Sequence, residues 1–188
     1  MPDLPSDPIY ADGVPLEDVD SFVYLGSRIE INGSSENEVG VRIAKAEGAF
    51  NLLKCNLWAL DRVSVQTKCR VYMTSVRPVL LYGCETWPLT SEDIRRLESF
   101  EFHCWRRILG IQRDDRVRNS DVLVRMGQPT TCSAELKKRR LTFLGHVLRM
   151  DHHRLPRRAL LSEPPPSWTR PMGGVRTTCS LLFKIWLP

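Results

Sequence analysis

The sequence has no apolar run close to the roughly 20 residues that a membrane-crossing helix needs, so we expect no membrane partner. It has no glycine-rich phosphate loop, which argues against a nucleotide site of that kind. Residues 1–8 are polar, acidic and rich in proline, without the apolar core of a secretory signal. We therefore expect an intracellular protein, in the nucleus or the cytoplasm, whose six cysteines are reduced and mostly buried.

Metal ligands also lack the usual spacing. Structural zinc sites combine closely spaced cysteine pairs with closely spaced histidine pairs, and no two cysteines here are that close. His152 and His153 are expected in a solvated turn, and His146 on a helix. His103 directly precedes Cys104, and helix neighbours do not face each other, so this pair forms no catalytic dyad. The sequence thus predicts no metal site and no cofactor.

The residues that are present favour a folded, basic protein. Apolar residues make up 42% of the chain and include five tryptophans, which is enough for a hydrophobic core. The net charge is +5, which favours acidic partners, nucleic acid first among them. This charge is uneven, because residues 1–40 are acidic and residues 135–158 are strongly basic.

Short β-elements are predicted before residue 30. Asp12-Gly13 is typical of a two-residue hairpin turn. Residues 22–29 are aromatic and β-branched, which predicts a strand, and Asn32-Gly33 should end it.

Helices are predicted after residue 30, because apolar residues recur there at spacings of three and four. Capping pairs mark two helix starts, Ser35 with Glu38 and Thr90 with Asp93. Pro78 should kink or stop the second helix. The predicted ranges are 35–56, 64–83 with the break at Pro78, 90–110, 121–126 and 133–150. The fold class is therefore mainly α, with a short N-terminal β-hairpin or strand, a helical bundle and an irregular tail rich in proline and glycine.

Several phrases occur in a characteristic order: FVYLGS at 22–27, RPVLLYGCETW at 77–87, RRILGI at 106–111, VRN at 117–119 and RLTFLGHVLRM at 140–150. Together they resemble the region that follows the catalytic palm in LINE-type (non-LTR) retrotransposon reverse transcriptases. The resemblance runs over about residues 12–160. It implies that residues 1–30 are a remnant of the palm-end strands, that 31–160 form a thumb and post-thumb-like domain, and that 161–188 are an irregular tail. In that family the thumb holds the template–primer duplex.

The resemblance does not extend to a complete catalytic motif. Reverse transcriptases hold two Mg²⁺ ions on paired aspartates, within a Tyr-Ala-Asp-Asp turn. Here Tyr10-Ala11-Asp12 is followed by Gly13, and Tyr10 lies 14 residues before Tyr24, much closer than the family's spacing. The upstream palm strand does not fit in the nine residues before Tyr10. We expect a hairpin turn, no catalytic residue and no enzyme activity in this chain, with Mg²⁺ needed only by the intact parent enzyme.

Basic clusters on helices provide the remaining functional signal. Lys137 and Arg140 are three residues apart and should share a helix face. Arg106 and Arg107 lie near a helix C-terminus, where cations also offset the helix dipole. The candidate nucleic-acid-binding residues are Arg106, Arg107, Arg113, Arg116, Arg118, Lys137, Arg140 and Arg149. The alternative interpretation is an ordinary solvated surface, with some cations paired to Glu98, Glu101, Asp114 or Asp115.

Two hypotheses follow. In the first, the chain is a reverse transcriptase fragment without its palm, which binds RNA or RNA–DNA template–primer duplex weakly and without sequence preference. Its protein partner would be the missing palm. In the alternative, it is a non-functional or recruited helical interaction protein with no nucleic-acid affinity, whose exposed apolar surface once met the palm.

Overall fold

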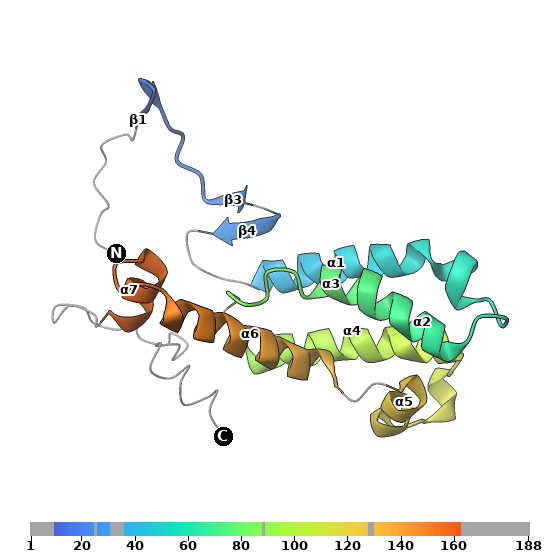
Figure 1. Cartoon of the computed structure of the whole chain (residues 1–188). Helices are drawn as coiled ribbons and strands as arrows, with labels where there is room; N and C mark the ends of the chain where they lie inside the picture. The colour runs from blue at the N-terminus through green and yellow to red at the C-terminus, as the bar shows by residue number, and fades with distance from the viewer. Residues whose placement is uncertain (1–9, 25, 31–35, 88, 128–129, 163–188) are drawn as a thin grey trace. The chain divides into compact units, whose positions relative to one another are not determined.

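A computed structural model describes residues 10–24, 26–30, 36–87, 89–127 and 130–162 (Figure 1). The chain divides into two compact units, Met1–Ser34 and Ser35–Pro188. The order of elements, short antiparallel strands followed by helices, confirms the predicted mainly α class. Ser35, the Asn32-Gly33 break and residues 163–188 of the predicted irregular tail (161–188) lie outside the described residues. Leu161, the first residue of that predicted tail, is still helical.

The first unit consists of two hairpins. Strands β1 (Tyr10–Ala11) and β2 (Val14–Pro15) pair antiparallel. Asp12 and Gly13 connect them with φ values of 51° and 79°. Both values are left-handed, as a type I′ hairpin turn requires. The hairpin predicted at Asp12-Gly13 is therefore confirmed.

The single strand predicted over residues 22–29 is wrong. The chain reverses within it, so that β3 (Ser21–Tyr24) and β4 (Ser27–Glu30) pair antiparallel, with Phe22 opposite Ile29. Gly26 has a φ of 82°, a conformation that glycine adopts without steric cost. The β-branched and aromatic run concealed this turn, because its residues favour strands on both sides.

The second unit begins with α1 (Glu36–Leu52), which buries Val39, Ala46 and Phe50 on one face. The short π-helix η1 (Lys54–Trp58) follows, so the predicted first helix ends in a wider turn. Helix α2 (Val65–Val71) starts at Ser64, whose hydroxyl accepts the Thr67 N–H at 3.2 Å as a cap.

Pro78 does not stop the second helix. The chain widens into the π-helix η2 (Tyr72–Val76) and continues as α3 (Arg77–Leu80), with Pro78 in the first turn. Proline is tolerated there because the first-turn amides have no partner within the helix. The apolar run after Pro78 thus stays helical, and Gly83 (φ 72°) lies just beyond it.

The second half of the unit packs around α4 (Ser91–Leu109), which contacts α1, α2, α5 and α6 (Figure 1). The predicted Thr90–Asp93 capping box is present. Beyond α4 come the 3₁₀ turn η3 (Arg113–Asp115), α5 (Asn119–Met126), α6 (Cys132–Arg149) and α7 (Leu155–Leu161). Gly110 and Gly127 follow α4 and α5 with left-handed φ, as predicted from the sequence. None of the described helices is long and apolar enough to cross a membrane.

Aromatic side chains fill the centre of the helical unit. Trp105 is completely buried and meets Tyr72 edge-on, with ring centroids 6.1 Å apart. Phe102 also packs edge-on against Trp105, at 5.2 Å. Trp87 is buried as well. Both tryptophans therefore pack in the core and are not exposed for base stacking.

One charged residue, Glu101, lies within this core. The Nε atom of Arg77 on α3 is 3.2 Å from its Oε1, and the backbone N–H of Cys132 donates to its Oε2 at 2.6 Å. Arg77 is itself buried. Burial raises the pKa of the Glu101 carboxyl above its usual range, although Arg77 and the Cys132 amide act against this shift. Glu101 thus links α3, α4 and the start of α6.

We expect Arg77→Met to destabilise the helical unit by about 3–5 kcal/mol, because it leaves a buried carboxylate without its counter-charge. Urea unfolding followed by circular dichroism measures this free energy. The matched control is Glu92→Gln, which breaks the exposed Arg95–Glu92 pair and should cost no more than about 1 kcal/mol. Equal losses in the two variants would show that the buried pair does not organise the unit.

Candidate nucleic-acid interface

The four residues of the basic run Lys137–Arg140 fall into an exposed pair and an inward-facing pair. Lys137 and Lys138 are exposed. Arg139 and Arg140 turn inward, because their guanidinium groups donate to the carbonyl oxygens of Leu81 (3.3 Å) and Trp87, respectively. Both carbonyls lie between α3 and α4, and each also accepts a backbone N–H, from Cys84 at 3.4 Å and from Leu89 at 3.0 Å, respectively.

Lys137 and Arg140 therefore do not form a shared exposed pair, in contrast to the prediction. Burial lowers the pKa of the Arg140 guanidinium, which agrees with its position against the protein. The sequence pattern placed both residues on one helix face, but it did not show that Arg140 contacts the loop after α3.

Arg106 and Arg107 also contact the protein. Arg106 Nη2 donates to the Val117 carbonyl at 3.1 Å and to Asn119 Oδ1 at 2.5 Å. Arg107 lies over the Phe50 ring, with its guanidinium carbon 5.1 Å from the centroid. Arg106 thereby fastens the segment that connects α4 and α5.

This segment, residues 112–118, is here called the arginine loop. Arg113, Arg116 and Arg118 are all exposed on it. The Gln112 N–H donates to Asp115 Oδ2 at 2.7 Å and closes the turn. Arg116 has a φ of 50°, an uncommon conformation for a long side chain. The loop thus has a defined backbone, fixed by Arg106 and Asp115, from which three cations project.

Three of the four predicted alternative partners of these cations interact with other groups of the protein. Glu101 pairs with Arg77, and Glu98 accepts a hydrogen bond from Ser133 at 2.5 Å. Asp115 closes the turn of the arginine loop. Within the described ranges, no ion pair joins a candidate cation to any of the predicted acids.

A second exposed group, here called the α6 cationic face, comprises Lys137, Lys138 and Arg149. Lys138 and Arg149 are eleven residues apart, close to three helical turns, and so project in similar directions. Gly145 lies between them, and the guanidinium of Arg149 folds over it: a Cβ at Gly145 would lie 3.2 Å from Arg149 Nη1. Lys138 was not among the predicted site residues, although it belongs to the same basic run.

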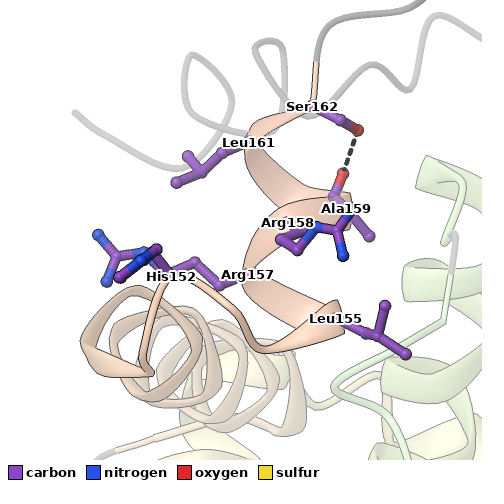
Figure 2. A pocket seen from close by; sticks show the side chains of 7 residues that line it. All are labelled: His152, Leu155, Arg157, Arg158, Ala159, Leu161 and Ser162. Atoms are coloured by element: carbon purple, nitrogen blue, oxygen red, sulfur yellow. Dashed lines mark hydrogen bonds between the residues drawn. The ribbon is translucent and has the colours of Figure 1, made fainter.

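The corner between α6 and α7 carries a shallow hollow, shown in Figure 2. Its wall is largely apolar, and Arg157 at its edge donates to the Met150 carbonyl at 2.5 Å. The lining residues are His152, Leu155, Arg157, Arg158, Ala159, Leu161 and Ser162.

The described cysteines are free thiols, most of them buried, as predicted, and Cys55 is exposed. Cys104 packs in the core stripe beside Trp105, also as predicted. Burial raises the pKa of Cys84 to about 11 and that of Cys104 to about 12. Nucleophilic chemistry needs the thiolate, so these two residues are suited to packing.

Comparison with known proteins points to a mobile genetic element. Over 177 residues the chain is 30% identical to a putative uncharacterized transposon-derived protein, F52C9.6, of Caenorhabditis elegans. The match covers 90% of this chain but only 62% of that relative, so the chain spans less than two thirds of its length. No protein-family profile matches the sequence, and no solved structure matches the chain. The similarity indicates a transposon-related origin.

The different roles of Arg140 and Lys137 can be tested by measuring the free energy of unfolding of single variants. Arg140→Ala removes a charged donor from the Trp87 carbonyl and should lower the free energy of unfolding by about 1.5–3 kcal/mol. Lys137→Ala, three residues away and exposed, should change it by no more than about 0.5 kcal/mol. Urea unfolding curves of the two variants give the comparison. If both changes were equally small, Arg140 would not be a structural residue.

Proposed function

We propose that residues 12–160 correspond to the palm end, thumb and post-thumb of a LINE-type reverse transcriptase. The similarity to a transposon-derived protein supports this assignment. So does the packing of the characteristic phrases. The RPVLLYGCETW phrase provides Arg77 and the carbonyls of Leu81 and Trp87, and the α6 phrase begins with Arg140, which donates to Trp87. Two phrases far apart in sequence thus form one interface.

In this proposal the helical unit holds template–primer duplex through its phosphates. The arginine loop is the main support for this proposal, because Arg113, Arg116 and Arg118 are exposed while Arg106 holds the loop backbone through the Val117 carbonyl. Cations of this kind bind backbone phosphates by releasing counterions and do not distinguish bases. The α6 cationic face adds a second set. The expected ligand is RNA or an RNA–DNA hybrid, bound weakly and non-specifically.

The proposal assigns no polymerisation to this chain alone. Two-metal phosphoryl transfer needs carboxylates that hold both ions. Asp12 lies at the tip of the β1–β2 hairpin, and its neighbour is Gly13. Mg²⁺ and the palm would belong to the intact parent enzyme, with the palm as the protein partner of this unit.

Fluorescence anisotropy with a labelled RNA–DNA hybrid tests the binding. We expect affinity at low salt that falls as salt rises, with little dependence on sequence. Changing Arg113, Arg116 and Arg118 to glutamine should reduce the slope of log K against log salt by about 0.7–0.9 for each phosphate that the variant no longer neutralises.

The control removes three equally exposed charges from other helices, by changing Lys45, Arg70 and Arg95 to glutamine. It should leave the slope nearly unchanged. Absence of binding by the wild-type chain at low salt would contradict the proposal. An equal reduction of the slope in both triple variants would contradict the assignment to the arginine loop.

The second candidate, a helical interaction protein, is favoured by exposed apolar side chains on α6 and α7. Leu141 and Phe143 are 44% and 40% exposed, and Leu155 is 73% exposed. Such a surface predicts self-association. Size-exclusion chromatography would then show oligomers, and the anisotropy experiment would show no binding at any salt concentration.

A further inference from the structure

The turn between α6 and α7 brings together three potential metal ligands. Asp151, His152 and His153 each offer one ligand atom, and these atoms all lie within 4.8 Å of one another. All three residues are exposed, so an ion could reach them from solvent. No part of the proposed nucleic-acid site uses these side chains.

The spacing is close to that around a bound ion. His152 Nδ1 and Asp151 Oδ1 are 3.3 Å apart. Ligand atoms at about 2.1 Å from a tetrahedral zinc ion are separated by about 3.4 Å. The Asp151–His152 pair already has this separation. The His153 ligand atom lies within 4.8 Å of the other two, and rotation of this exposed side chain can bring it closer.

The turn itself is fixed by its backbone. The His153 N–H donates to Asp151 Oδ1 at 3.0 Å, and the Arg154 N–H donates to the Asp151 carbonyl at 3.0 Å. The first of these bonds orients the carboxylate, as hydrogen bonds to ligating groups do in metal sites. Little ordering would therefore be needed when an ion binds.

We propose that Asp151, His152 and His153 bind a divalent transition-metal ion of the zinc class. Two imidazoles and one carboxylate suit Zn²⁺, Ni²⁺ or Cu²⁺, whereas Mg²⁺ and Ca²⁺ prefer oxygen ligands throughout. Water would complete the coordination, because the site is open to solvent. Arg157, at the adjoining hollow (Figure 2), adds positive charge nearby. We therefore expect the affinity for the ion to be that of an exposed site with three protein ligands, which is weaker than that of a closed structural zinc centre. The sequence pattern did not indicate this site, because the zinc spacing sought there required cysteine pairs.

Isothermal titration of the full chain with ZnCl₂ tests this proposal. We expect one ion bound per chain. His152→Ala/His153→Ala should weaken binding at least tenfold, since even removal of a supporting hydrogen bond weakens metal sites by about 10–100-fold. Asp151→Asn should weaken it as well. His103→Ala removes an exposed histidine from α4 and should have no effect, and circular dichroism verifies the fold of each variant.

Cobalt distinguishes the ligands. Co²⁺ bound by imidazole and carboxylate gives visible d–d bands without the near-ultraviolet charge-transfer band of a thiolate ligand. Cys55→Ser removes the one exposed thiol among the described residues and should leave the spectrum unchanged. Zinc affinity that survives in the double histidine variant, a thiolate band, or competition by an equal concentration of Mg²⁺ would each overturn the proposal.

Discussion

The carboxylate of Glu101, enclosed in the aromatic core, constrains the whole helical unit. A buried carboxylate without partners would cost several kcal/mol, so the fold must deliver donors to it from elsewhere. Arg77 arrives on α3 and the Cys132 amide at the start of α6. Once these are in place, the position of α6 is fixed, and Arg139 and Arg140 reach the carbonyls that follow α3. Glu101, a charged residue among the buried apolar residues of α4, thus links three helices.

This arrangement divides the cations of the chain by role. Arg77, Arg106 and Arg140 satisfy carboxyl, amide or carbonyl oxygens of the protein and so belong to its packing. The arginine loop and the α6 cationic face project outward instead. A positive net charge therefore overstates the charge available to a ligand. The proposed binding of phosphates depends on the arginine loop and the α6 cationic face. The buried and half-buried arginines hold these two surfaces in position.

Local signals in the sequence predicted most of the elements, and interactions between distant residues explain the features that these signals did not predict. The Thr90 cap and the Asp12-Gly13 turn act between residues close in sequence, so they could be recognised there. The inward turn of Arg140 could not, because its acceptor lies 53 residues away. The reversal at Gly26 was hidden within a run that favours strands throughout. The sequence shows that Asp151, His152 and His153 are adjacent, but only the geometry of the turn shows that their ligand atoms lie close together.

We conclude that chemically similar cations of this chain have different roles. Arginine footprinting with p-hydroxyphenylglyoxal, read out by peptide mass spectrometry, tests it on the full chain with and without RNA–DNA hybrid. We expect Arg113, Arg116, Arg118 and Arg149 to react readily in the free protein and to become protected when the hybrid is added. Arg77 and Arg140 should remain unreactive in both states. Ready modification of Arg140 in the folded free protein, or no protection of the arginine loop at saturating hybrid, would contradict it.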